Sequence, residues 1–187
     1  MYYHASQISG IQILEPHTSN HNTPMIYFST KRENVLVYLS NAIEKYCGET
    51  NFEHKGKWQK WGPYGFNKDG RQRIEEYYSN ALMDTYKGVS GYIYYAEKIK
   101  ENDFPLQIPD AAVSSEPVPV VFCEYIPDAY EAILEAERKG LLTIQRYEDS
   151  PPEQLEWIAR TIRKEYEDAV NQPDYRHFLE GKFSSLL

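Results

Sequence analysis

Two short apolar-aromatic runs near the start of the chain each carry one side chain that could contact a polar ring. The run Tyr2–Ser6 holds His4, and the run 26–30 holds Tyr27. Both runs are predicted to be strands, and both end in hydroxyl residues. An imidazole and a phenol on neighbouring strands could hold a flat polar ligand by an edge and by a face. His4 and Tyr27 are therefore the first candidate site, and its chemistry suits a nucleotide.

The elements that position these residues are many short strands with a few helices between them. Apolar patterning predicts strands at 2–6, 11–14, 25–29, 91–96, 118–125 and 141–144. It predicts helices at 31–47, 128–138 and 151–170, a turn or short helix at 79–87, and an amphipathic tail at 175–187. The remaining ranges are expected to be loops at 16–24 and 101–115 and a β-meander at 51–78. This order is typical of an α+β fold, with residues 1–149 as one domain and 150–187 as a helical extension packed on it.

Local signals mark several element boundaries. Thr30 and Glu33 have the spacing of a capping box for the helix at 31–47, and Gly48 suits its C-terminal cap. Asp69-Gly70 is a hairpin turn signal inside the meander. Ser150, followed by Pro151, predicts the cap and first turn of the last long helix.

Composition limits the classes of function. The chain has 187 residues and a formal net charge of −8, so non-specific binding to nucleic acid is disfavoured. Its two cysteines, Cys47 and Cys123, form no disulfide framework, and Cys123 is expected to be a buried small hydrophobe. There is no apolar run of membrane-spanning length and no leader pattern, so we expect a cytoplasmic protein without a membrane partner.

Two polar segments could each have either a binding role or an ordinary structural role. Residues 55–73 interleave Lys and Arg with Trp58, Trp61 and Phe66, a mixture that could stack bases. A hairpin with a solvated face is the favoured alternative, since aromatic residues pack well on sheets. His17 and His21 have metal-like spacing but lie in a polar loop without an acidic or Cys partner, so no metal site is expected.

Four short motifs follow one another in an order that resembles a known family. They are Tyr3-His4-Ala5-Ser6, Ile26-Tyr27-Phe28-Ser29, Gly91-Tyr92-Ile93-Tyr94 and Glu116-Pro117-Val118. This order is similar to that of the ADP-ribosyltransferases of the diphtheria-toxin and poly-ADP-ribose polymerase type, and most similar to the rifampin ADP-ribosyltransferases. The resemblance covers residues 2–121. It implies an ADP-ribosyltransferase-like fold of split antiparallel sheets with flanking helices, followed here by the C-terminal helical extension.

The resemblance implies that NAD is bound as a co-substrate and that its ADP-ribosyl group is transferred with loss of nicotinamide. His4 would hydrogen-bond a ribose hydroxyl, and Tyr27 would stack on the nicotinamide ring. Ala5, Ser6 and Ser29 would complete the cofactor-binding set, with Ser6 or its backbone on the carboxamide. The family has Gly where this chain has Ala5, so the added methyl group either narrows the site or is tolerated. The sequence does not identify the acceptor, but residues 55–73 lie outside the shared pattern and could read it, with Trp61 as the test position.

Transfer also needs a carboxylate near the ribosyl cation that develops in the transition state. The resemblance implies Asp103, in the loop after the strand at 91–96. Glu116 at the start of a predicted strand is the first alternative, and Glu97 is the second. The catalytic set is therefore His4 and Tyr27 with Asp103 or Glu116, unless no catalytic acid is retained.

Two other functions stay open. A non-catalytic nucleotide-binding or interaction module of the same fold would keep the pocket without the acid. An RNA 2′-phosphotransferase-like enzyme would share the fold and use NAD, but it needs arginines to hold a phosphate, and the first arginine after His4 is Arg32. The oligomeric state is equally open.

Overall fold

The computed structural model describes residues 1–18, 23–56, 59–100 and 108–187, and its largest element is an antiparallel sheet. The strands of this sheet are β1 (Tyr2–Ser6), β3 (His17–Thr18), β4 (Pro24–Ser29), β7 (Gly91–Ala96), β8 (Ala111–Ser114) and β10 (Phe122–Ile126). Their order is β10-β7-β1-β4-β3, and β8 also pairs with β4. The mixed α+β class with antiparallel sheets is therefore confirmed.

The large sheet is nearly divided between β1 and β4. Strand β1 pairs with β7 along its whole length, from Tyr2 opposite Ala96 to Ser6 opposite Tyr92. By contrast, β1 and β4 share the single registered pair Tyr3 and Ser29. Strand β4 pairs more fully with β8, from Ile26 opposite Ser114 to Ser29 opposite Ala111, so the two halves of the sheet are joined only weakly next to His4.

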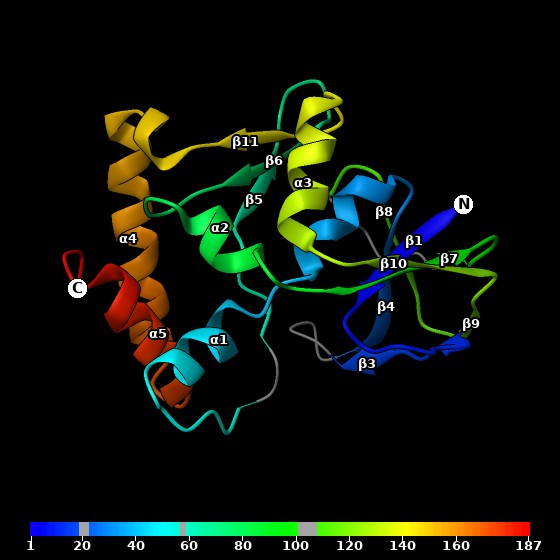
Figure 1. Ribbon diagram of the computed structural model, residues 1–187, viewed down its shortest axis with the longest axis horizontal. Helices are drawn as coiled ribbons and strands as arrows, with labels where there is room; N and C mark the ends of the chain where they lie inside the picture. The colour runs from blue at the N-terminus through cyan, green and yellow to red at the C-terminus, as the bar shows by residue number, and fades with distance from the viewer. Residues whose placement is uncertain (19–22, 57–58, 101–107) are drawn as a thin grey trace.

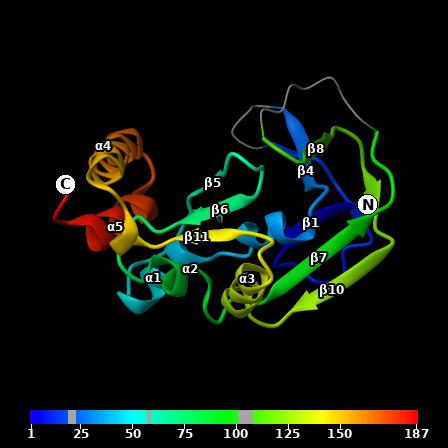
Figure 2. The same cartoon turned by 90° about the horizontal axis from the view of Figure 1, so that it is seen from above.

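Two smaller sheets and the helices complete the fold. The smaller sheets are β5 (Tyr64–Phe66), β6 (Gln72–Glu75) and β11 (Thr143–Gln145), and the pair β2 (Ile13–Leu14) with β9 (Val118–Pro119). The helices are η1 (Arg32–Tyr38), α1 (Ala42–Glu49), α2 (Ala81–Tyr86), α3 (Ala129–Arg138), η2 (Tyr147–Asp149), α4 (Pro152–Asp168) and α5 (Pro173–Phe183). Figures 1 and 2 show the large sheet and the N-terminus at one end, α1, α4, α5 and the C-terminus at the other, and β5, β6 and β11 between them.

Three apolar clusters hold these parts together. One lies between the large sheet and η1, α2 and α3, and includes Leu36, Ile93 and Ile133. A second lies on the opposite face of the sheet and includes Phe28 and Tyr94. The third joins α1 to α4 and α5; its buried side chains are Ala42, Ile43, Cys47, Trp61, Tyr77, Ile158, Ile162, Phe178, Leu179 and Phe183. The apolar stripe predicted on the last long helix is thus core packing.

The single helix predicted at 31–47 is wrong, because the chain forms the 3₁₀ helix η1 and then restarts as α1. Val35, Leu36, Val37 and Leu39 are all almost fully buried. An amphipathic α-helix buries one stripe, whereas this segment is enclosed on every side. After Leu39 the chain turns and begins α1, which packs against a different partner, α5.

The three predicted helix caps are wrong, and the cap that the structure does show was not predicted. Neither η1 nor α4 has a side-chain cap: the Thr30 hydroxyl donates to the Asp110 carbonyl, and the Ser150 hydroxyl donates to the Arg146 carbonyl. Gly48 lies inside α1 rather than after it. Asp128 does cap α3, because its side chain accepts the backbone N–H groups of Tyr130 and Glu131.

The β-meander predicted at 51–78 is reduced to one hairpin. Strands β5 and β6 pair with Tyr64 opposite Ile74, around the turn at Asp69-Gly70. Gly70 has a positive φ of 81°, which the predicted turn requires. The third strand of this sheet is β11, which comes from a distant part of the chain and runs parallel to β6. Local patterning could not reveal that long-range pairing.

The loop predicted at 101–115 and the strand predicted at 118–125 are also corrected. Residues 111–114 form β8, and the predicted strand is interrupted between β9 and β10. Pro119 has no N–H to continue a ladder, and it pairs with β2 rather than with β7. Cys123 is exposed, not buried, because it lies on the edge strand β10.

The helices also bear on a membrane role. None of the helices in the described ranges combines the length and apolar character that a bilayer crossing requires.

Candidate functional site

A cleft opens between β4, η1 and the β5–β6 hairpin. Five aromatic residues line it, namely Tyr27, Phe28, Tyr38, Tyr64 and Phe66. Residues from β4, η1, β5, β6 and β8 meet here, so the site is a product of tertiary structure.

The aromatic walls of the cleft support one another. The rings of Tyr38 and Tyr64 meet edge to face at 6.4 Å, and their hydroxyl oxygens are 3.1 Å apart. Tyr64 and Phe66 make a second edge-to-face contact, with centroids 6.0 Å apart. Burial raises the pKa of Tyr38 far above its ordinary value, so this phenol stays neutral. The walls are therefore rigid, uncharged surfaces against which a flat ring could lie.

Two buried amides lie among these rings. Asn34 is 5% exposed, and within the described residues neither its Nδ2 nor its Oδ1 has a hydrogen-bond partner. Gln72 is 1% exposed; its Nε2 donates to the Asn34 carbonyl at 3.1 Å, while its Oε1 has no partner within the described residues. An unpaired buried polar atom costs about 1–3 kcal/mol. A ligand with amide-like donors and acceptors would remove that cost.

His4 and Tyr27 are joined, but not through their rings. Nδ1 of His4 bonds the backbone oxygen of Tyr27 at 2.9 Å. Because Tyr3 is opposite Ser29 and side chains alternate along a strand, Tyr27 projects from the Tyr3 face of the sheet and His4 from the other. The His4 ring accordingly meets Phe28, at 5.9 Å. Tyr27 lines the cleft, and His4 is not among its lining residues.

The bond to Tyr27 fixes the state of the His4 imidazole. A carbonyl only accepts, so Nδ1 is the donor and Nε2 is left as an acceptor. Burial lowers the pKa of His4 and His17 lowers it further, while the bond to the Tyr27 carbonyl acts in the opposite direction. His4 is thus a neutral ring that holds the backbone of β4 where the two halves of the sheet are joined only weakly.

The remaining cofactor-binding candidates divide between the cleft and other places. Ser29 lines the cleft, and its hydroxyl oxygen accepts the Lys31 backbone N–H at 3.1 Å. Ser6 accepts the Ile8 backbone N–H at 3.1 Å. Ala5 belongs to the apolar cluster under η1, so its methyl group packs in the core.

None of the predicted acids lines the cleft in the part of the chain that the structure describes. Asp103 lies outside the described residues. Glu116 is exposed, and its carboxylate forms an ion pair with Lys100. Glu97 is exposed at the end of β7. The lining residues of the cleft include no Asp or Glu.

A charged group that the sequence did not indicate joins η1 to the sheet. Arg32 donates two hydrogen bonds to Glu124, of 2.8 and 2.5 Å, and the Tyr95 hydroxyl donates to the same carboxylate at 2.7 Å. These hydrogen bonds lower the pKa of Glu124, and those from Arg32 have the largest effect. The arginine and the glutamate are 92 positions apart, so no sequence spacing predicts this pair.

The basic and aromatic segment at 55–73 is mostly used within the fold. Trp61 is 5% exposed and meets Phe178 at 4.9 Å between ring centroids, so it belongs to the helical core. Arg71 and Arg73 pair with Asp69 and Glu75. Trp58 lies outside the described residues. The interpretation of Trp61 as an acceptor contact has no exposed surface to support it.

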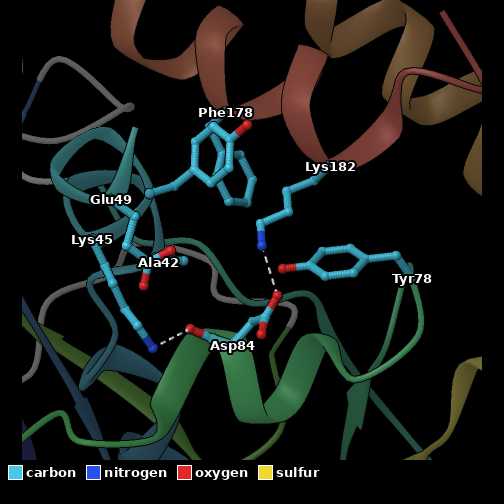
Figure 3. Close-up of a pocket in the computed structure, with 8 residues that line it drawn as sticks. Ala42, Lys45, Glu49, Tyr78, Asp84, Phe178 and Lys182 are labelled. Atoms are coloured by element: carbon cyan, nitrogen blue, oxygen red, sulfur yellow. Dashed lines mark hydrogen bonds and ion pairs between the residues drawn. The ribbon is translucent and has the colours of Figure 1, made fainter. Parts of the chain in front are cut away.

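A second hollow lies between α1, α2 and α5 (Figure 3). Both of its lysines contact Asp84: Lys182 Nζ lies 2.7 Å from Asp84 Oδ2, and Lys45 Nζ donates to the Asp84 carbonyl at 3.1 Å. Across the described ranges, no three His, Cys, Asp or Glu side chains gather closely enough to hold a metal ion. His17 is exposed on β3, and His21 lies outside those ranges.

Comparison with known proteins adds no relative from which a function could be transferred. No family model, no curated protein and no solved structure matches this chain.

Proposed function

We propose that this protein binds a nicotinamide nucleotide in the cleft between β4, η1 and the β5–β6 hairpin, and acts as an NAD-dependent ADP-ribosyltransferase-like protein. The single observation that carries the proposal is that the buried amides of Asn34 and Gln72 hold three polar atoms without partners in the described residues, among aromatic walls. The ordered motifs of the sequence supply the choice of nicotinamide.

The chemistry of nicotinamide matches this lining. The ring is flat and apolar on its faces, and it would lie against Tyr27 and the Tyr38–Tyr64 wall. Its carboxamide has one acceptor and two donor hydrogens. Asn34 has both a donor and an acceptor to offer, and Gln72 has an acceptor. Binding would satisfy three buried atoms that have no partner in the described residues.

Transfer requires breaking the bond between the nicotinamide nitrogen and the ribose C1′. Nicotinamide leaves with the bonding electrons, and an acceptor nucleophile forms the new bond to C1′ and loses its proton. A carboxylate near the developing cation would stabilise it. Asp103 remains the proposed acid and Glu116, whose carboxylate pairs with Lys100, remains the alternative. The acceptor is not assigned.

Thermal unfolding with nicotinamide mononucleotide tests the binding step. At ten times its Kd a ligand stabilises the folded state by about 1.4 kcal/mol, which raises Tm by a few degrees for a chain of this size. Asn34→Ala should abolish the shift. Asn41→Ala is the matched control, because Asn41 also has a buried unpaired oxygen but does not line the cleft. No shift in the wild type at millimolar ligand would contradict the proposal.

Release of nicotinamide from NAD⁺ tests the transfer step separately. We expect slow release in the wild type and loss of release, with binding retained, in Asp103→Asn. The same loss in Glu116→Gln instead would assign the acid to Glu116. Binding without any release would show a non-catalytic nucleotide-binding module.

A further inference from the structure

Lys60 differs from Lys55, Arg71 and Arg73, three other basic residues of the segment at 55–73, in having no carboxylate partner among the described residues, and it differs from the exposed Lys68 in being half-buried. Lys55, Arg71 and Arg73 each have a carboxylate within 3 Å, at 2.9, 2.7 and 2.6 Å. Lys60 has none within 4 Å in the described ranges. Its Nζ donates to the Gly62 carbonyl at 2.8 Å. A half-buried ammonium without a counter-ion is uncommon, since burial without a partner disfavours the charge.

This ammonium is not itself a lining group of the proposed nucleotide cleft, but it lies against two aromatic rings that are. Lys60 Nζ is 4.7 Å from the ring centroid of Tyr64 and 5.9 Å from that of Tyr38. Both tyrosines line the cleft. The two rings attract the cation through their faces, but they cannot neutralise it. The position therefore combines a positive charge with a neutral, aromatic binding surface.

The backbone holds Lys60 in this place. Gly62, whose carbonyl accepts from Lys60, has a positive φ of 138°. A side chain at Gly62 would also collide with the hydroxyl group of Tyr86. The next residue after Lys60, Trp61, is anchored in the helical core. Because Trp61 and Gly62 are both held in place, the backbone next to Lys60 is already positioned before a ligand binds.

We propose that Lys60 forms an anion subsite at the edge of the cleft and contacts the phosphate of the nucleotide whose ring lies between Tyr27 and the Tyr38–Tyr64 wall. This inference rests on the proposed function, which identifies the ring as nicotinamide. What it adds is that a phosphate or pyrophosphate group of the same ligand is bound, and that Lys60 binds it. A phosphate would supply the counter-ion that Lys60 lacks.

Paired ligands separate this subsite from the ring pocket. Nicotinamide riboside has the ring without the phosphate, and nicotinamide mononucleotide has both. Lys60→Met should weaken binding of the mononucleotide by about tenfold and leave the riboside unchanged, as expected for one lost charge-assisted contact. Lys60→Arg should restore most of the loss. Lys68→Met, at an exposed lysine of the same segment, is the matched control.

The outcomes distinguish the two proposals. If Lys60→Met weakens both ligands equally, or neither, Lys60 does not bind the phosphate and the subsite is wrong. If the wild type binds neither ligand, the proposed function fails instead. If inorganic phosphate binds alone and neither nicotinamide compound competes with it, the anion site is separate from any ring pocket, which also overturns the subsite.

The pH dependence gives a second readout. Burial lowers the pKa of Lys60 to about 8, and Glu165 on α4 acts weakly in the opposite direction. The other titratable groups that face it are Tyr38 on η1 and Tyr64 on β5. Mononucleotide affinity should therefore fall as pH rises through about 8, as Lys60 loses its proton. Riboside affinity should stay flat, and Lys60→Arg should remove the slope for the mononucleotide.

Discussion

The two hollows of this protein differ in the polar side chains that line them, lysines held by Asp84 in one and buried amides in the other. The hollow between α1, α2 and α5 is rich in charge, but Lys45 and Lys182 are both engaged by Asp84 (Figure 3). The cleft beside β4 has no charged lining residue in the described ranges, yet Asn34 and Gln72 hold buried atoms without partners there. Unpaired neutral groups indicate a ligand better than paired charges do, because the paired charges are already satisfied by the chain.

This comparison predicts different consequences of mutation on the two sides. Changes around the charged hollow should alter stability and leave ligand binding intact. Changes in the cleft should alter binding and leave stability nearly intact. The following variants test that division in order of their expected effect on stability.

Phe178→Ala should have the largest effect. Phe178 is fully buried, lines the charged hollow and packs on Tyr46 and Trp61. Truncating a buried Phe costs about 3–5 kcal/mol. Urea unfolding measures the loss, and titration with nicotinamide mononucleotide on the folded protein should give the wild-type Kd. If the alanine variant does not fold, Phe178→Leu provides the same test at a smaller cost. A large rise in Kd in a folded variant would break the comparison.

Arg32→Met should have the next largest effect, and it should depend on pH. Glu124 has a lowered pKa in the folded state because Arg32 and Tyr95 donate to it. Its stabilising contribution is therefore present above the unfolded pKa and is lost as pH falls through the lowered folded value. After allowance for partial solvent exposure, the pair contributes about 1–2 kcal/mol at neutral pH.

Urea unfolding of wild type and Arg32→Met across pH 2 to 7 measures this contribution. The difference between the two proteins should be constant at neutral pH and should shrink below about pH 4, where Glu protonates. Glu124→Gln should remove most of the acid dependence of the pair. A difference that is independent of pH would show that Arg32 acts through packing alone.

Lys182→Met should have a smaller effect. The substitution keeps an apolar stem against Tyr46 and Tyr78 and removes the ion pair with Asp84, whose side chain is 38% exposed. Partly exposed pairs contribute up to about 1 kcal/mol. Lys164→Met is the control, because its pair with Asp168 is exposed and should contribute less. If Lys182→Met also removes nucleotide binding, the charged hollow is a ligand site and the comparison fails.

The parts of the fold that could be predicted from the sequence are those with strong local signals. Strand β7 and helix α3 were predicted because one has a dense aromatic run and the other has a regular apolar stripe that ends before Gly140. The prediction of one α-helix over η1 was wrong. Val35, Leu36 and Val37 are three consecutive buried residues, whereas the apolar periodicity of an amphipathic helix describes burial along one face only. Strand β8 was missed because residues 111–114 are mostly small and become a strand only by pairing with β4.

The candidate site shows the same limit. Tyr27 and Ser29 were singled out from their motif and do line the cleft. Asn34 and Gln72 were not, because an amide in a helix or a strand is unremarkable until its burial is known. Lys60 was noticed only as one of several basic residues. Its lack of a counter-ion is a property of the folded chain and has no sequence signal.

Gln72→Leu should have the smallest effect on stability and is for that reason the most discriminating variant. It removes the hydrogen bond from Nε2 to the Asn34 carbonyl, which contributes about 1 kcal/mol, but it also removes the buried, unpaired Oε1, whose burial costs about as much. Stability should therefore change little in either direction. Affinity for nicotinamide mononucleotide should fall about tenfold, as expected when a buried polar contact to a ligand is lost.

Gln145→Leu is the matched control, since Gln145 lies on β11, in the same small sheet, and outside the cleft. It should keep the wild-type affinity. Two results would contradict the comparison. A large loss of stability in Gln72→Leu would show that this amide is structural, like the charges of the other hollow. An unchanged Kd for nicotinamide mononucleotide would show that Oε1 of Gln72 does not contact the ligand, because losing such a contact should raise the Kd about tenfold.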